Sequence, residues 1–141
     1  MKDDNAAKDK SFAFAVRCVK LYMYLKEQKG VYDLARQLLR SGTSIGANVK
    51  EGLFAQSKAD FIAKMSIAKK EAAETEYWLE LLQEVGILNE KEAASMLEQC
   101  RELIKILVTT CKSSKHGKSA CYKSDYELEN DEFDDDDKEL G

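Results

Sequence analysis

Apolar residues recur along this chain at intervals of three and four positions, the spacing of one face of an α-helix. Four segments carry this spacing, and they are separated by glycines and polar capping residues. Proline, which breaks helices, is absent. The pattern therefore predicts four helices, over residues 9–29, 31–54, 58–85 and 90–112.

The expected core-facing positions follow from the same spacing. In the third and fourth segments the apolar positions alternate at four and three residues, a heptad pattern typical of left-handed helix packing. Capping pairs open both segments, Ser57 with Asp60 and Asn89 with Glu92. The first segment is expected to face the core with Phe12, Val16, Val19 and Met23.

Small residues crowd the second segment between Arg40 and Gly52. Each interior glycine costs a helix about 1 kcal/mol relative to alanine, so propensity alone would break the helix within 41–46. The apolar spacing resumes in phase at Ile45, which favours a continuous or slightly bent helix. The small side chains then predict a close approach to a neighbouring helix.

Four helices with short connections near Gly30 and Gly86 predict an all-α fold, an up-down-up-down antiparallel four-helix bundle over residues 9–112. Residues 1–8 are expected to form a flexible N-terminus. Residues 113–141 are expected to form a flexible tail, basic and then acidic, because they lack the apolar surface that would offset the entropy of ordering.

The net charge of −4 conceals two oppositely charged parts. Residues 1–123 hold 21 Lys and Arg against 16 Asp and Glu, a balance of +5. Residues 124–141 hold one lysine against 10 acids, a balance of −9. The expected bundle is thus mildly basic, and only the tail is strongly acidic.

Two cellular settings are disfavoured. No apolar run approaches the roughly 20 residues that cross a bilayer, and the first residues lack the apolar centre of a signal peptide. The four cysteines follow no Cys-x-x-Cys pattern and suit a reducing compartment. We expect a cytoplasmic protein with no membrane partner.

Catalytic constellations are missing from the pattern. The single histidine, His116, lies beyond the fourth expected helix, so a carboxylate–histidine metal site, a zinc site and a nucleophilic triad are all disfavoured. Gly42 and Gly46 are not followed by the Gly-Lys-Ser/Thr of a phosphate-binding loop. We expect no enzyme activity, no cofactor and no bound metal.

Five short motifs carry a resemblance to a known family. They are Gln-Leu-Leu-Arg at 37–40, Ser-Ile-Gly-Ala-Asn-Val-Lys-Glu-Gly at 44–52, Ser-Lys-Ala-Asp-Phe at 57–61, Ala-Glu-Thr-Glu at 73–76 and Gly-Ile-Leu at 86–88. Together they resemble the signature of the four-helix bundle proteins of the 23S rRNA intervening-sequence family, over about residues 10–112.

The resemblance implies a left-handed bundle that assembles into a homo-oligomeric ring, commonly a homopentamer. Relatives include the accessory protein of diversity-generating retroelements, which binds nucleic acid and a reverse transcriptase. Many members of the family have no assigned activity. The acidic tail is not part of the family pattern.

A row of polar side chains three or four residues apart lies on one face of the second expected helix, with two glutamates of the third helix as candidate partners. We call these residues the polar row: Gln37, Arg40, Ser44, Asn48, Glu51, Glu74 and Glu76. One interpretation is a buried network that fixes the register of the bundle, favoured because buried polar groups must find partners. The other is a recognition surface or subunit junction.

Two functions from different classes remain open. The first is a non-enzymatic nucleic-acid-binding or ribonucleoprotein accessory module, whose partners would be RNA, DNA or a nucleic-acid enzyme. Its candidate contacts are Lys64, Lys69, Lys70, Lys105, Lys112, Lys115, Lys118 and Lys123. The alternative is a structural oligomer that binds protein partners, with the acidic tail as a partner segment or as a self-mask over the basic residues.

Overall fold

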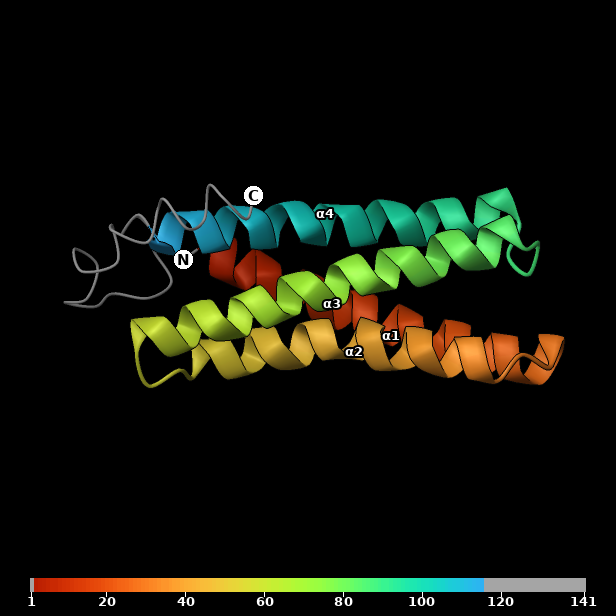
Figure 1. Cartoon of the computed structure of the whole chain (residues 1–141), viewed down its shortest axis with the longest axis horizontal. Helices are drawn as coiled ribbons and strands as arrows, with labels where there is room; N and C mark the ends of the chain where they lie inside the picture. The colour runs from red at the N-terminus through yellow and green to blue at the C-terminus, as the bar shows by residue number, and fades with distance from the viewer. Residues whose placement is uncertain (1, 116–141) are drawn as a thin grey trace.

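The computed structural model describes residues 2–115, which form four helices with short connections (Figure 1). Consecutive helices lie side by side and run in opposite directions, as an up-down bundle requires. None of the four described helices is apolar enough over its length to span a membrane. Their bounds are α1 Lys2–Lys29, α2 Asp33–Leu53, α3 Lys58–Glu84 and α4 Glu90–Lys115.

The start of the first helix and the end of the fourth differ from the prediction. Helix α1 begins at Lys2 and not at residue 9, so the predicted start of the first helix is wrong. The extra turns are held by Ala7, which is buried in the core one turn before Ser11. Helix α4 continues to Lys115, three residues beyond its predicted end. Residues 116–141 lie outside the described part of the chain.

The face of α1 that packs into the core is not the predicted one. Phe14, Cys18 and Leu25 are fully buried there. The helix carries apolar residues on two faces, and periodicity alone cannot tell which face meets the other helices. The four expected core residues are instead exposed large hydrophobics: Phe12, Val16, Val19 and Met23.

The small residues of α2 produce a close contact between α1 and α2. Helix α2 is continuous through them, as predicted. Gly42 is buried, and a Cβ atom built there would lie only 2.4 Å from the Cys18 sulfur and 3.0 Å from the Cys18 Cβ. The two helices therefore pack closely because position 42 carries no side chain.

Glycines and capping side chains set the connections. Gly30 (φ 67°) and Gly86 (φ 82°) have the left-handed backbone that favours glycine after a helix. The Ser57 hydroxyl accepts a hydrogen bond from the Asp60 amide at 3.0 Å, which confirms the predicted cap of α3. At the start of α4, the amide and side chain of Asn89 form reciprocal hydrogen bonds with Glu92 at 2.9 and 2.8 Å.

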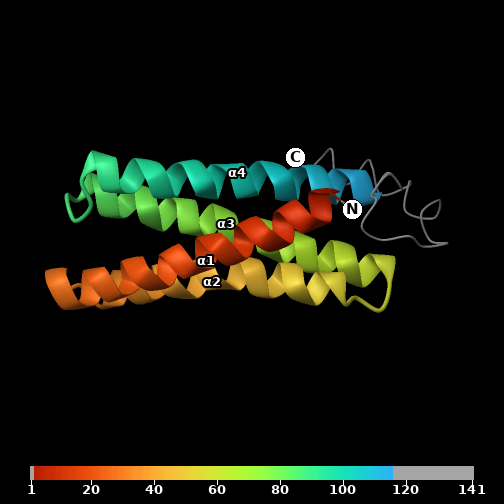
Figure 2. The same ribbon diagram turned by 180° about the vertical axis from the view of Figure 1, so that it is seen from behind.

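Helix α1 crosses the bundle obliquely (Figure 2). Its C-terminal half lies along α2, and its N-terminal end reaches α4. Long polar side chains bridge α1 and α4: Lys10 binds Glu102 at 2.5 Å, and Arg17 donates to Gln99. Polar side chains thus cross the α1–α4 seam at its surface.

The contact at Gly42 gives a matched prediction. Gly42→Ala should lower the free energy of unfolding by about 1–3 kcal/mol, because the new methyl group overlaps the buried Cys18 side chain. In the same helix, the nearest neighbour of a Cβ at Gly46 is the Ser11 backbone oxygen at 3.4 Å. Gly46→Ala should therefore be neutral or stabilising by up to about 1 kcal/mol. Urea unfolding followed by circular dichroism measures both.

A second variant isolates the cause. Cys18→Ala removes the sulfur atom that the Gly42→Ala methyl group would meet, so the double variant should recover part of the lost stability. Equal destabilisation by Gly42→Ala with and without the Cys18 sulfur would contradict the close-contact explanation.

Candidate functional site

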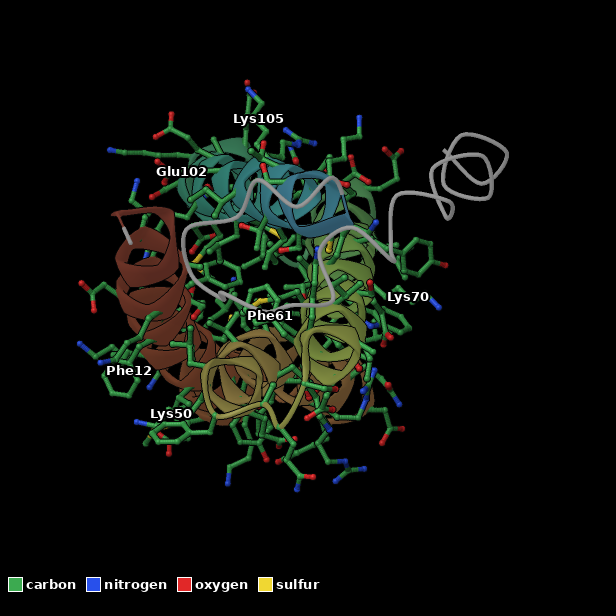
Figure 3. The ribbon with its side chains drawn as sticks, turned by 90° about the vertical axis from the view of Figure 1, so that its left-hand side faces the viewer. Phe12, Lys50, Phe61, Lys70, Glu102 and Lys105 are labelled. Carbon is green, nitrogen blue, oxygen red and sulfur yellow. The ribbon has the colours of Figure 1, made fainter. Side chains whose placement is uncertain are left out.

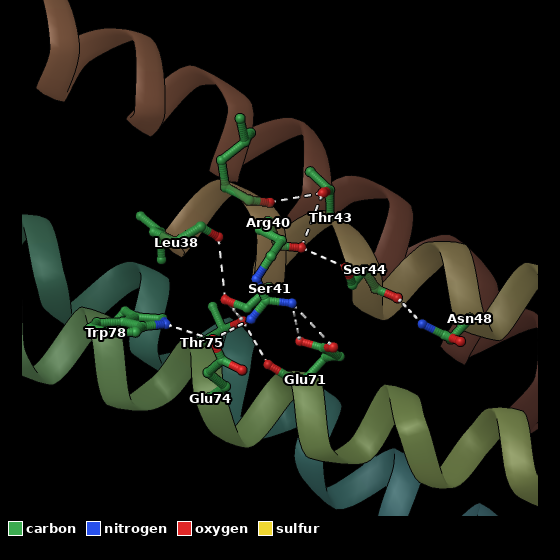
Figure 4. A network of polar contacts seen from close by, with 11 residues as sticks. Leu38, Arg40, Ser41, Thr43, Ser44, Asn48, Glu71, Glu74, Thr75 and Trp78 are labelled. Carbon is green, nitrogen blue, oxygen red and sulfur yellow. Dashed lines mark hydrogen bonds and ion pairs between the residues drawn. The ribbon is translucent and has the colours of Figure 1, made fainter. Parts of the chain in front are cut away.

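The centre of the polar row lies at the seam between α2 and α3 (Figure 4). The Arg40 guanidinium donates to both carboxylate oxygens of Glu71, at 3.3 and 3.4 Å, and also to Glu74. Glu74 in turn accepts a hydrogen bond from the Trp78 indole at 2.9 Å. The Arg40 side chain is 50% exposed, so this network lies at the surface and is open to a partner.

The other members of the polar row do not join one network. The Ser44 hydroxyl and the Asn48 amide donate to carbonyl oxygens of their own helix, at 2.6 and 2.9 Å. Glu51 pairs with Lys64 at 3.1 Å. Glu76 faces the opposite side of α3.

There Glu76 pairs with Arg101 of α4 at 2.7 Å, and Arg101 also binds Glu80 at 2.9 Å. Gln37 is exposed on α2. The structure therefore brings together Arg40 and Glu74 of the polar row, with Glu71 and Trp78 as partners that the sequence did not single out.

The buried polar contact between α2 and α3 is a different one. The Thr75 hydroxyl lies 2.8 Å from the Ser41 hydroxyl and 2.8 Å from the Glu71 carbonyl oxygen. Ser41 and Thr75 are fully buried, and each hydroxyl has a partner. This pair, shown in Figure 4, fixes the register of the two helices in the way that was expected of the polar row. No sequence signal linked the two positions, since Ser41 lay among small residues and Thr75 on an apolar heptad face.

Electrostatics at the Arg40 network follow from these contacts. The hydrogen bond from Arg40, followed by that from Trp78, lowers the pKa of the Glu74 carboxyl below its ordinary value of 4.5. The Glu74 hydrogen bond is likewise the main reason that the pKa of Arg40 is raised. Both groups are therefore charged at neutral pH, and their attraction favours the folded state.

The cysteines in the core are poor nucleophiles. Burial raises the pKa of the Cys18 and Cys100 thiols to about 12, so neither forms a thiolate at neutral pH. Cys111 is also buried. Cys121 lies outside the described residues. Among residues 2–115, no group of three His, Cys, Asp or Glu side chains is placed to hold a metal ion.

The candidate nucleic-acid contacts are spread over the bundle. Lys105 points outward from α4 and Lys70 from α3, on different sides in the end-on view of Figure 3. Lys112 lies seven residues after Lys105, on the same side of α4, and is also exposed. Lys64 is paired with Glu51, and Lys69 is half-buried.

The remaining three candidates lie at or past the end of α4. Lys115 is the last residue of that helix. Lys118 and Lys123 lie outside the described residues. Of the candidates with described side chains, Lys105 and Lys112 are therefore the pair that one phosphate backbone could follow along a single helix.

The surface that sequence reasoning missed is on α1. We call Phe12, Val16, Val19 and Met23 the α1 apolar face. Phe12 is 71% exposed. An apolar surface presented in register along a helix is typical of a protein–protein contact. The double apolar periodicity of the first segment was the available signal for it.

A groove continues the α1 apolar face toward α2. Its volume is about 590 Å³, and Phe12 and Ala15 of α1 and Ala47 and Lys50 of α2 are among its lining residues. Figure 3 shows Phe12 and Lys50 pointing outward on the same side of the bundle. The small residues Gly46 and Ala47 of α2 leave this hollow open beside Phe12.

The Glu74 pKa yields a pH-dependent prediction. A lowered pKa means that the ionised carboxylate stabilises the fold above the pKa of the unfolded chain and that this stability is lost as the pH falls through the folded value. Glu74→Gln should therefore cost up to about 1 kcal/mol at neutral pH, as exposed ion pairs do. The difference from the natural chain should shrink as the pH falls below the ordinary carboxyl pKa of 4.5 and vanish once the pH is below the lowered pKa of the folded state.

Urea unfolding at pH 7 and at pH 3 measures this difference. The fluorescence emission of Trp78, the single tryptophan, reports loss of its hydrogen bond to Glu74. Glu98→Gln, at an exposed position of α4, is the control and should leave both readouts unchanged. A Glu74→Gln effect of the same size at pH 3 and pH 7 would contradict the assignment to the ion pair.

Comparison with known proteins gives a family and a fold. The sequence model of the family described as 23S rRNA-intervening sequence protein matches residues 3–109. No curated protein matches the chain.

A solved structure matches this chain over almost the whole length of the solved protein. It is a crystal structure of a protein with unknown function from the S23 ribosomal protein family of Bacteroides thetaiotaomicron VPI-5482. The two chains are 48% identical, the match covers 78% of this chain and 98% of the other, and the TM-score is 0.77. The chain therefore belongs to the 23S rRNA-intervening sequence protein family.

Proposed function

We propose that this protein is a non-enzymatic, self-associating four-helix module whose subunits join through the α1 apolar face. The observation that carries the proposal is the exposure of that face, which places Phe12, Val16, Val19 and Met23 in solvent. Removing such side chains from water is favourable by about 25 cal/mol per Å² of apolar area. A second copy of the chain would supply that burial.

The groove beside Phe12 supports a contact in which side chains of two copies fit into one another. A protruding aromatic ring next to a hollow formed by Ala15 and Ala47 allows side chains of two copies to interdigitate. If the copies meet head to tail, the same contact repeats around an axis and closes a ring. The proposal includes what the family resemblance implies, namely a left-handed bundle that assembles into a ring of five copies.

A second candidate function is an accessory role in a nucleic-acid or ribonucleoprotein complex of the cytoplasm. It is supported by the +5 balance of residues 1–123, by the exposed Lys105 and Lys112, and by the RNA named in the family's description. One bundle offers few phosphate contacts, but an oligomer repeats them and so strengthens weak binding. Binding of protein partners, with the acidic tail as the partner segment, is the alternative for the same oligomer.

If the chains associate through the α1 apolar face, a charge placed on that face should weaken the association. Val19→Lys places a charge in the middle of the α1 apolar face and should shift the protein toward the monomer at micromolar concentration. Val85→Lys is the matched control, since Val85 is exposed at the end of α3, away from this face. Sedimentation velocity measures the mass, and circular dichroism should show an unchanged helix content for both variants.

A monomeric natural chain, or equal loss of mass in both variants, would overturn the proposed interface. The second outcome would mean that added charge, and not its position on α1, controls assembly.

Nucleic-acid binding predicts a response to salt. The joint variant Lys105→Gln and Lys112→Gln should weaken RNA binding and flatten the dependence of the binding constant on salt, because each phosphate contact releases counterions. Fluorescence anisotropy with a labelled RNA at two salt concentrations measures both. Lys20→Gln, an exposed lysine of α1, serves as the charge-matched control for one position. Salt-independent binding by the natural chain would exclude this role.

A further inference from the structure

Helix α3 presents a second exposed surface with large hydrophobic side chains. Ile67 is 41% exposed and Tyr77 is 56% exposed. The Tyr77 ring packs edge to face against the Trp78 ring, with 5.0 Å between the centroids, and Trp78 is held by its hydrogen bond to Glu74. An exposed aromatic ring with this support is typical of a protein–protein contact. We call the exposed residues on this side of the helix the α3 outer face: Ile67, Lys70, Ala73 and Tyr77.

The helices that carry the two exposed faces have opposite charge. Helix α1 holds seven Lys and Arg against four Asp and Glu over residues 2–29, a balance of +3. Residues 71–85, around Tyr77, hold five glutamates and no Lys or Arg. Counting Arg40 and Arg101, which pair with four of these glutamates, the balance there is −3. Charge complementarity therefore favours α1 against α3 of another copy over a contact between two α1 helices.

The α1 apolar face and the α3 outer face also agree in length and in position along the bundle. Helices α1 and α3 begin at the same end and run in the same direction (Figure 1). Phe12 and Met23 lie 10 and 21 residues after the start of α1, and Ile67 and Tyr77 lie 9 and 19 residues after the start of α3. At 1.5 Å per residue, the two faces are about 17 and 15 Å long. Two copies side by side in the same orientation can therefore bring these faces together.

One copy can use both faces at the same time. Helices α1 and α3 each pack against α2 and α4, so they occupy opposite corners of the bundle. In the end-on view of Figure 3, Phe12 of α1 and Lys70 of α3 point outward on different sides. Each subunit can thus offer its α1 apolar face to one neighbour and its α3 outer face to another.

We propose that the α1 apolar face binds the α3 outer face of a second copy of this chain, in a head-to-tail contact. Tyr77 of one copy packs between Val19 and Met23 of the next, and Ile67 enters the groove beside Phe12. The inference rests on the self-association proposed above and adds the surface on the second copy that completes the interface.

A head-to-tail contact has two different halves, which can be blocked separately. Tyr77→Lys should block the α3 outer face as Val19→Lys blocks the α1 apolar face, so either variant should sediment as a monomer where the natural chain is assembled. Val85→Lys is the matched control for α3, because Val85 and Tyr77 are both 56% exposed and Val85 lies about 12 Å further along the helix direction, beyond the contact. Ile67→Lys is a second block of the same face, for use if Tyr77→Lys loses helix content by circular dichroism.

A mixture of the two blocked variants tests which faces pair. The Val19→Lys chain keeps its α3 outer face, and the Tyr77→Lys chain keeps its α1 apolar face. Mixed in equal amounts, the two should form dimers and no larger species, because only one compatible pair of faces remains. Sedimentation velocity of the separate and mixed samples measures the masses.

If Tyr77→Lys and Ile67→Lys assemble as the natural chain does while Val19→Lys is monomeric, the α3 outer face is not the partner surface, and the proposed α1 interface still stands. A mixture that stays monomeric would likewise overturn the head-to-tail pairing. A monomeric natural chain would overturn the proposed self-association itself, and this inference with it.

Discussion

The bundle depends on the absence of a side chain at Gly42. With only hydrogen there, the Cys18 sulfur occupies the space that a methyl group would fill, and α1 packs closely against α2. That contact selects which face of α1 is buried, because it draws Cys18, Phe14 and Leu25 inward. The exposure of the opposite apolar residues of α1 follows from the same choice.

Much of the fold could be predicted from local patterns. The capping pair of Ser57 and Asp60 placed the start of α3 correctly, since the signal is contained in four consecutive residues. The heptad positions of α3 are buried as expected. The orientation of α1 could not be predicted, because two apolar stripes share one helix and only tertiary contact distinguishes them.

The candidate site was predicted only in part, for the same physical reason. Helical spacing correctly placed Arg40 on the α3 side of α2, but it does not specify which partner lies across the seam. Arg40 meets Glu74 as anticipated, and also Glu71, whereas Glu76 turns toward α4 and Arg101. The buried Ser41–Thr75 pair depends on the register between two helices, which a single sequence does not reveal.

The oblique path of α1 has a consequence for how the molecule opens. Its seam with α4 is bridged by exposed charged and polar side chains, such as Lys10 with Glu102, whose attraction is weak in water. Local opening should therefore begin where the N-terminal turns of α1 leave α4, while α2 and α3 stay closed around their buried hydroxyl pair. A detached α1 could then occupy the same place in a neighbouring molecule, so that two copies exchange their first helices.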